Sequence, residues 1–420
     1  MGRWVISFSE SPRTLRLEDL LIKPDHSIVK QVHERFLPGL LYGLGDADKE
    51  ELKNRTRLMC NDDGFGAIWY KSDPENNDRD VKPAQYRSIA PIATDLNFKH
   101  LCSQTESSCI ASHIRDATYP PVIEVNNHPF TFGNIAFQHD GFIASFDIIR
   151  FSVLEKINQL QTTVQAHPKT ITPSVKDGNY IFALTGNSDT EHLALLFTAY
   201  FDIIRAGLLA QAPRHTKLEL VENQAMLMAL ILAADDIQKI QKNHLVGSYK
   251  QTSPWDGNFL NIGIVNRGSS LLVTRWRDSP EGQPSSLYIS FTAGEKLDPK
   301  DKPPLAPPGD DPAETKVESA EDKIKSRPQI QGLHLIVGSE PCTRNKDDWG
   351  LFGQNQGLIV NPAGIIELLH LKDAFSPEKI KNHRDILQKL VEYLDAAEPQ
   401  PPFPMPHIEP DGPEISGMNK

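Results

Sequence analysis

Residues 109–118 have the sequence CIASHIRDAT, in which a short apolar run leads directly into a cluster of polar and charged side chains. Residues 109–114 are few, include β-branched residues and are followed by turn-forming residues, a pattern that predicts a β-strand. Loops at the ends of strands often gather binding residues, because the rigid scaffold fixes them in place. The segment therefore predicts a strand that presents His113 and Arg115 at a loop.

Four other segments share this character: residues 61–66 (NDDGFG), 126–130 (NNHPF), 139–141 (HDG) and 186–192 (GNSDTEH). Each lies where a predicted strand or helix begins or ends. Each also has an ordinary structural explanation, since Asp63-Gly64 is typical of a turn and Ser188 with Glu191 is typical of a helix capping box. Taken singly, these segments favour turns and caps over a functional site.

The rest of the sequence alternates short strands with long helices. The β-branched and aromatic runs predict strands at 3–8, 66–70, 109–114, 135–139, 259–266, 270–276, 286–291, 334–338 and 357–361. Helical spacing of apolar residues predicts helices at 145–160, 189–210, 217–243 and 377–396. Two groups of strands flanked by helices predict an α+β protein with layered sheets.

Composition limits the classes of partner. The chain has 420 residues, a length that fits two to three domains of roughly 150 residues or one large domain with insertions. It has 44 Lys and Arg against 55 Asp and Glu, a formal net charge of -11. An acidic chain without basic blocks is poorly suited to a polyanion, so we expect no nucleic-acid partner. The mean hydropathy of -0.40 and the lack of a long apolar run predict no membrane-spanning helix and no membrane partner.

Other signals favour a cytoplasmic protein. The N-terminus from Met1 to Ser7 lacks the basic start and long apolar run of a secretory signal. The four cysteines form no disulfide framework and none has C-x-x-C spacing; they are Cys60, Cys102, Cys109 and Cys342. Cys60 and Cys109 are interpreted first as small buried groups. No motif has the spacing of metal ligands, so we expect neither a metal nor a cofactor.

Two segments depart from a globular pattern. Residues 293–330 are dense in Lys, Asp, Glu and Pro, and residues 398–420 are rich in Pro. Such compositions bury too little apolar surface to offset the entropy of ordering. We therefore predict one domain at 1–292 that continues at 331–397 with a C-terminal helix, interrupted by a disordered insertion at 293–330 and followed by a tail at 398–420.

Together, the order and spacing of the polar segments resemble class II glutamine amidotransferases, the N-terminal-nucleophile family. That family has Met-Cys-Arg-Trp/Phe, Asn-Gly-Asp-Gly-Phe-Gly, Ala-His-x-Arg-x-Ala-Thr, Asn-x-His-Pro-Phe, His-Asn-Gly and Ser-Thr-Asp-Ser-Glu in this order. The matching segments run from Met1 to about His192, and residues 260–291 and 337–341 continue the resemblance. The chain most resembles the single-domain fungal branch related to the glutathione-degrading amidotransferase subunit, with members in secondary-metabolite pathways such as chrysogine biosynthesis. The resemblance implies a four-layer αββα N-terminal-nucleophile sandwich.

By position, the resemblance implies a binding site for an amino-acid-like ligand. Arg115 would bind the α-carboxylate and Asp189 would accept the α-ammonium. Asn127, His128 and Gly141 would line the site. These roles fit the side chains, because a guanidinium makes bidentate bonds to a carboxylate and an aspartate pairs with an ammonium.

The chain departs from the family at the residues that carry out its chemistry. The family has a cysteine after Met1, whose thiol attacks the side-chain amide, and this chain has Gly2. Cysteine-dependent glutaminase activity is therefore not expected. The family's Asn-Gly oxyanion pair is replaced by Asp140-Gly141, and a carboxylate would repel a developing oxyanion. Asp116 is a third change, in place of a small residue.

Two functions remain open. In one, the protein acts non-covalently on a glutamine-, γ-glutamyl- or aminoacyl-containing intermediate in a fungal secondary-metabolite pathway. Asp140 and His139 would then be its acid and base, since burial can raise the pKa of a carboxyl towards neutrality. In the other, it is a pseudoenzyme that binds a ligand or acts as a scaffold for a peptidase or synthetase partner. Both functions keep Arg115 and Asp189 as ligand-binding residues.

Overall fold

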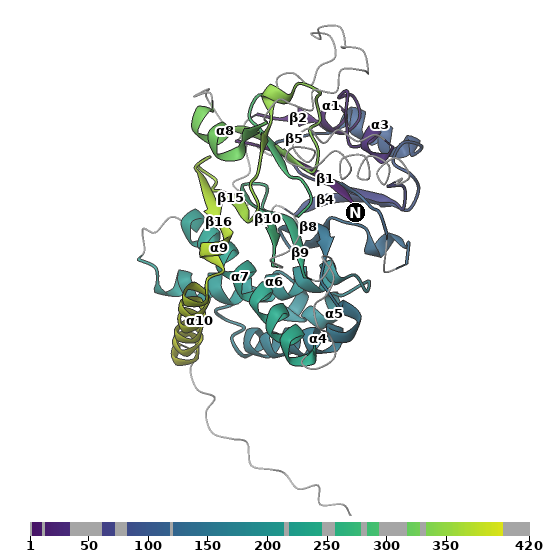
Figure 1. The fold of residues 1–420 in the computed structure, drawn as a ribbon. Coiled ribbons are helices and arrows are strands. Elements are labelled where there is room, and N and C mark those ends of the chain that lie inside the picture. Colours follow the sequence, from purple (N-terminus) through teal and green to yellow (C-terminus); the bar gives the residue numbers. More distant parts are fainter. Residues whose placement is uncertain are drawn as a thin grey trace, which may run out of the picture.

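A computed structural model of the chain describes residues 2–10, 13–33, 61–71, 82–117, 121–213, 218–245, 257–278, 284–293, 317–327 and 333–397. Its strands form two large sheets that lie between helices (Figure 1). The order in the eight-stranded sheet is β12-β14-β11-β13-β1-β6-β3-β4. Its strands are β1 (Arg3–Ser9), β3 (Phe65–Tyr70), β4 (Pro83–Ser88), β6 (Cys109–Ile114), β11 (Tyr288–Ser290), β12 (Glu318–Ser319), β13 (His334–Gly338) and β14 (Gly350–Leu351).

Strand β1 lies inside this sheet and pairs antiparallel with both β6 and β13. Its register with β6 places Arg3 opposite Ile114 and Trp4 opposite His113. The start of the chain therefore lies beside the end of the strand that leads into Arg115.

The second sheet has six strands, in the order β16-β15-β10-β9-β8-β7, and every pairing is antiparallel. The strands are β7 (Phe130–Phe132), β8 (Ile135–Phe142), β9 (Phe259–Asn266), β10 (Ser270–Arg277), β15 (Gln356–Val360) and β16 (Ile366–His370). Every residue of β9 is buried, which shows that both faces of the sheet are covered. Asp140 of β8 lies opposite Asn261 of β9, so both side chains leave the same face.

One helical layer covers the outer face of the six-stranded sheet. It contains α4 (Phe146–Ala166), α5 (Tyr180–Ala183), α6 (Asp189–Gln211), α7 (Leu218–Leu245) and α10 (Pro377–Ala397). Phe137 of β8 packs against Phe197 of α6 with ring centroids 5.8 Å apart and the rings tilted by 54°. Helix α6 is long and apolar enough to cross a membrane, but 78% of its most apolar window is buried in the structure. Its burial is that of a core helix.

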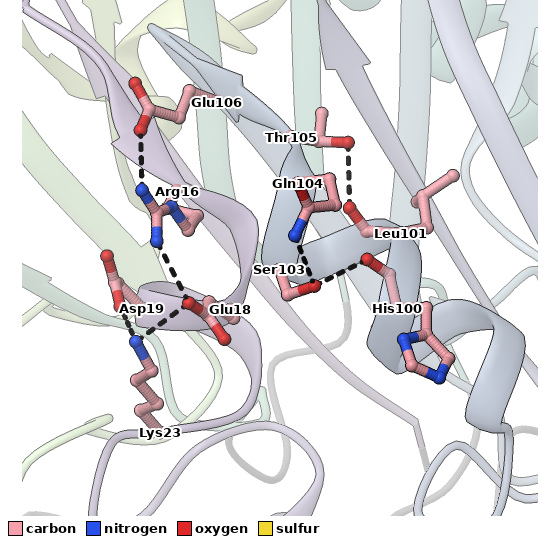
Figure 2. Close-up of polar contacts among 10 residues, drawn as sticks. All are labelled: Arg16, Glu18, Asp19, Lys23, His100, Leu101, Ser103, Gln104, Thr105 and Glu106. Atoms are coloured by element: carbon pink, nitrogen blue, oxygen red, sulfur yellow. Dashed lines mark hydrogen bonds and ion pairs between the residues drawn. The ribbon is translucent and has the colours of Figure 1, made fainter.

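A second helical layer covers the outer face of the eight-stranded sheet and includes α1 (Leu17–Leu21) and α3 (Leu96–Gln104). A small sheet of β2 (Leu15–Arg16) and β5 (Glu106–Ser107) lies beside them. Figure 2 shows Arg16 between Glu18 at 3.4 Å and Glu106 at 3.3 Å, where it ties the two short strands together. The remaining elements are α8 (Ala320–Ser326), α9 (Leu371–Ala374) and the 3-10 turns Lys30–Val32, Glu124–Asn126, Lys176–Gly178 and Lys346–Asp348.

The two sheets pack directly on each other. Ile6 of β1 approaches Gly263 of β9 so closely that a Cβ atom at Gly263 would lie 2.6 Å from the Ile6 Cδ1 atom. Buried residues from both sheets, including Phe8 and Val273, form the core between them. The layers are therefore helix, sheet, sheet and helix, and the predicted α+β fold with an αββα sandwich is confirmed.

Most predicted elements agree with the structure, and the differences have physical reasons. The four predicted helices and nine predicted strands are all present, several with the predicted bounds. The sequence missed β4, whose residues are mostly polar and partly exposed at the sheet edge. The prediction that all of 293–330 is disordered is wrong for residues 317–327, which form β12 and α8 with Ala320 buried. Residues 294–316 and 398–420 lie outside the described residues.

Candidate functional site

Arg115 is the first residue after β6 and is held by the loop before β3. Its backbone N–H donates to the Gly64 carbonyl at 2.9 Å, and its Nη1 atom donates to the Pro121 carbonyl at 3.2 Å. Asp63 accepts a hydrogen bond from the Ala117 N–H at 2.7 Å. Gly64 has φ of +103°, a conformation that favours glycine. The two loops thus fix each other and keep the 5% exposed Arg115 in place.

Asp189 is the first residue of α6, and it is fixed by the end of β8. Its Oδ2 atom accepts from the Ile143 N–H at 2.8 Å and its Oδ1 atom from the Thr190 N–H at 2.7 Å. Ser188 caps the helix by accepting from the Thr190 and Glu191 N–H groups. A carboxylate in the first helical turn is also favoured by the helix dipole. Asp189 is therefore held at a defined position by backbone hydrogen bonds.

Arg115 and Asp189, which we call the head-group pair, lie close enough for the charge of Asp189 to affect the pKa of Arg115. Burial lowers the pKa of Arg115, and the charges of Asp63 and Asp189 oppose this shift. The two side chains come from different layers of the fold, one from the eight-stranded sheet and the other from α6. The structure thus brings together the two residues that the sequence predicted to bind the charged groups of an amino acid.

Asn127 and His128 lie in the turn before β7 and are buried. Asn127 Nδ2 donates to the Ser88 carbonyl at 2.9 Å. The His128 ring lies 4.3 Å from the His113 ring and 4.9 Å from the Phe130 ring, between centroids. Burial lowers the pKa of His128 well below its usual range. His128 is therefore a neutral wall of the site.

Gly2 stands at the position of the family nucleophile, and the atoms packed around it leave no space for a side chain. A Cβ atom on Gly2 would lie 2.7 Å from His113 Cε1 and 2.8 Å from the Ile114 carbonyl oxygen. Burial first, and then the charges of Arg115 and His139, lower the pKa of His113 to about 3. A neutral imidazole ring therefore takes the space where a side chain at residue 2 would begin.

No described cysteine offers a replacement thiol. Cys102, Cys109 and Cys342 are free and buried, and burial raises the pKa of Cys102 and Cys342 to about 12. Burial also raises the pKa of Cys109. These thiols stay protonated at neutral pH, and a thiol is a poor nucleophile compared with a thiolate. Cys60 lies outside the described residues.

His139 is held by hydrogen bonds at both ring nitrogens. Nε2 lies 2.5 Å from the Phe259 carbonyl oxygen, and Nδ1 lies 3.0 Å from the Thr190 hydroxyl. Because a carbonyl only accepts, Nε2 must carry the proton. The ring therefore connects β8 to β9 and α6, which argues against the predicted role of His139 as an acid or base.

Asp140 follows His139 in β8 and has a carboxyl group left unsatisfied by the described residues. It is 2% exposed, and neither of its carboxylate oxygens has a hydrogen-bond partner among the described residues. Burial raises its pKa, and the nearby charges of Arg3 and His139 oppose this shift. Gly141 follows it, where a Cβ atom would lie 2.1 Å from the Phe259 carbonyl oxygen. We call Gly2, His139 and Asp140 the reaction end of the site.

The start of β1 is supported by a buried ion pair that the sequence analysis missed. Arg3 Nε donates to Glu340 Oε1 at 2.6 Å, and His26 Nε2 lies 2.9 Å from the other Glu340 oxygen. Arg3 Nη1 also donates to the Gly2 carbonyl at 2.6 Å. The resemblance covers residues 337–341, but nothing in the spacing predicts that Glu340 and Arg3, separated by 337 positions, form a pair.

The loop before α6 is fixed by two further residues outside the predicted site. Glu191 accepts from the Thr185 N–H at 2.9 Å and from the Gly186 N–H at 2.8 Å. Asn126 accepts from the Asn187 N–H at 3.1 Å. The spacing of Ser188 and Glu191 predicted a capping box, so the sequence did indicate a structural role for Glu191. The partner of Asn126 could not be read from local sequence.

A large cavity of about 910 Å³ lies elsewhere in the molecule. It is lined by residues 171–178 together with Arg205 and Arg267, and none of the predicted site residues contributes to it. Within the described part of the chain, no three His, Cys, Asp or Glu side chains gather to hold a metal ion. The predicted site residues therefore lie outside this cavity.

Known proteins place this arrangement in context. No protein-family model matches the chain. The protein named probable glutamine amidotransferase DUG3 from Saccharomyces cerevisiae is 26% identical over 370 residues, which cover 88% of this chain and 84% of the yeast protein.

Two solved structures show more distant likeness. A glutamine aminotransferase class-II domain protein from Silicibacter pomeroyi is 15% identical with a TM-score of 0.44, and the match covers 87% of this chain and 97% of that one. Glutamine phosphoribosylpyrophosphate amidotransferase from B. subtilis is 13% identical with a TM-score of 0.36, over 90% of this chain and 50% of that one. Both scores are low, so the fold assignment rests on the layers and sheet order above. Over most of its length, the chain is therefore glutamine amidotransferase-like in sequence.

Proposed function

We propose that the protein binds an amino-acid-like ligand and acts on it without a thiol nucleophile. The ligand is a glutamine-, γ-glutamyl- or aminoacyl-containing compound. The observation that carries this proposal is the head-group pair, in which Arg115 and Asp189 are each fixed by backbone hydrogen bonds. The resemblance of the motifs to the fungal branch supports a role in secondary metabolism, and the cysteine pattern supports a cytoplasmic location.

The head-group pair suits the two charges of an α-amino acid. The Arg115 guanidinium makes charge-assisted bonds to a carboxylate, and the Asp189 carboxylate pairs with an ammonium. Because the loops around Arg115 are fixed by Asp63 and Gly64, little ordering is needed when the ligand binds. Preorganisation of this kind raises affinity by reducing the entropy lost on binding.

At the reaction end, Asp140 is the group that could move a proton. Its burial favours the protonated form, and a protonated carboxyl can donate to a leaving group or a carbonyl oxygen. A protonated Asp140 also avoids the repulsion that a carboxylate would exert on an oxyanion. The reaction would therefore be a proton transfer from the Asp140 carboxyl to the bound compound, with no covalent bond formed between the protein and the ligand.

A second candidate is a binding or scaffold subunit that works with a peptidase or synthetase partner. The hydrogen bonds at both nitrogens of His139 favour it, because they leave Asp140 without a second group for acid-base chemistry. The absence of a side chain at Gly2 points the same way. Both candidates depend on the same ligand-binding residues.

Calorimetry tests the shared part of the proposal. Glutamine, glutamate and a γ-glutamyl dipeptide are titrated into the wild type, into Arg115→Ala and into Arg115→Lys. Loss of a desolvated charge partner costs about 2–5 kcal/mol, so Arg115→Ala should weaken binding ~30-fold or more. Lysine should rescue only partly, because a point charge does not reproduce the planar fork.

Lys176→Ala is the matched control, since it removes a cation that lines the separate cavity. It should leave binding unchanged. If the wild type binds none of these compounds or the lysine analogues described below, and Arg115→Ala behaves like the wild type in every assay, the proposal is wrong. Mass spectrometry of candidate metabolites incubated with the protein then separates the two candidates, since only the first predicts turnover.

A further inference from the structure

Several buried polar groups without partners gather at the reaction end, between the two sheets. They include both Asp140 oxygens, the Asn261 Oδ1 atom directly across the strand pair and the indole N–H of Trp4. None of these atoms has a hydrogen-bond partner among the described residues. Native proteins satisfy the great majority of buried polar groups with protein or water. Because several unsatisfied polar groups gather here, we infer that a ligand binds between them and supplies the missing hydrogen bonds.

Asp140 also has no ion-pair partner of its own in the described part of the chain. The charges that act on it are those of Arg3, the N-terminal ammonium and His139, which favour the carboxylate, and that of Asp116, which opposes it. Arg3 is bound to Glu340 at 2.6 Å, and His139 is held by Phe259 and Thr190. His113 is neutral at physiological pH because burial lowers its pKa to about 3. A buried carboxylate without a counter-ion is costly, and an incoming cation would remove that cost.

The separation of Asp140 from the head-group pair fits an extended side chain. Asp189 is bound to the Ile143 N–H, and Ile143 follows Asp140 by three residues at the end of β8. Ile143 lies one residue beyond the end of β8, so three residues of backbone separate its Cα atom from that of Asp140, a distance of at most about 11 Å. An amino acid with a side chain of three or four methylene groups matches this span, with a charge at each end.

We propose that the ligand is an α-amino acid with a cationic side chain, whose distal cation binds Asp140 while its head group binds Arg115 and Asp189. The proposal rests on the proposed function for the head group and adds the charge of the distal end. In the family that the sequence resembles, the neutral side-chain amide of an asparagine stands at the position of Asp140. In this chain a carboxylate replaces that amide, and Gly2 replaces the cysteine thiol. Both changes are expected if the protein holds the far end of its ligand by charge and does not attack it with a nucleophile.

Four ligands of similar length test the charge of the distal end. Lysine and ornithine carry a distal ammonium, glutamine a neutral amide and norleucine an apolar end. A hydrogen bond to a charged group is worth about 1.5–3 kcal/mol, so lysine or ornithine should bind roughly ten- to a hundred-fold more tightly than glutamine and norleucine. Calorimetry on the full chain with its native N-terminus measures these affinities.

Asp140→Asn should remove the preference by weakening lysine and ornithine to the level of norleucine while glutamine binds as well or better. Asp177→Asn makes the same chemical change at an exposed residue lining the separate cavity, and it should leave all four affinities unchanged. Thermal melting of both variants confirms that they are folded.

The outcomes separate this inference from the proposed function. If glutamine binds at least as tightly as lysine and ornithine, and Arg115→Ala abolishes that binding, the cationic ligand is wrong and the head-group pair stands. Equal binding of lysine and norleucine also overturns the inference. If none of the four ligands binds, and neither do glutamate and the γ-glutamyl dipeptide, the proposed function itself fails.

Discussion

The two ends of the site differ in how their side chains are satisfied. At the head-group pair, Arg115 and Asp189 are held by backbone groups of neighbouring loops and strands. At the reaction end, Gly2 has no side chain, and Asp140 is buried without a hydrogen-bond partner among the described residues. The polar groups of one end have their partners within the chain, and under our proposal the ligand supplies the partner that is missing at the other end.

Compared with the family that the sequence resembles, this chain keeps the residues at the head-group end of the site and changes those at the reaction end. Recognition of an amino-acid head group needs two opposite charges at fixed positions, and both are present. Hydrolysis of an amide needs a nucleophile and donors for an oxyanion. The chain has Gly2 and Asp140 at these positions, so the proposed function keeps the binding of the head group and gives up the thiol chemistry.

The largest expected effect concerns the support beneath the reaction end. Glu340→Ala would leave the Arg3 guanidinium, 10% exposed in its side chain, without its buried carboxylate. Breaking a buried ion pair from one side typically costs about 3–5 kcal/mol. Chemical denaturation should show a loss of this size in the free energy of unfolding.

The matched control is Lys23→Ala, which breaks the exposed pairs of Lys23 with Glu18 and Asp19 (Figure 2). Exposed pairs contribute about 0–1 kcal/mol, so this variant should melt close to the wild type. Equal losses in the two variants would show that Glu340 does not support β1 in the way described.

The fold was largely predictable because its signals are local. The strand at Cys109–Ile114 and the helix at Asp189–Gln211 follow from runs of apolar residues with clear ends. Edge strands such as Pro83–Ser88 lack such runs, because one side faces solvent. Residues 317–327 were misassigned because their charged composition hides one buried alanine, Ala320.

The site was predictable only in part, because the remaining contacts join distant segments. The resemblance located Arg115 and Asp189, and the structure places them as electrostatic neighbours. It could not predict that Phe259 and Thr190 occupy both nitrogens of His139. The ion pair of Arg3 with Glu340 likewise depends on the pairing of β1 with β13, which no local pattern encodes.

The next effect is on activity and tests whether the reaction end can be restored. Gly2→Cys alone should not give strong glutamine hydrolysis, because Asp140 lacks the amide N–H donor that asparagine has at the family's oxyanion site and the new Cβ atom would crowd His113. Loss of one oxyanion donor typically costs ~10²–10³ in rate. The double variant Gly2→Cys with Asp140→Asn should therefore be faster, as measured by ammonia release. Efficient hydrolysis by the single variant would contradict the role given to Asp140.

The smallest effect is a pH-dependent gain in stability from Asp140→Asn. Burial raises the pKa of Asp140 in the folded protein, whereas in the unfolded chain it should be near the ordinary value of about 3.9. As pH rises above this value, the unfolded chain loses the proton first, so the wild type loses stability until the folded-state pKa is passed. An asparagine does not titrate, and it avoids the burial of a charge. The variant should therefore match the wild type below about pH 4 and exceed it at pH 7 by on the order of 1–3 kcal/mol, the usual cost of an unsatisfied buried group. Denaturation of both proteins across this pH range measures the difference, in which the contributions of other titrating groups cancel. A variant that is less stable than the wild type at pH 7 would show that the Asp140 carboxylate already has a partner in the folded chain.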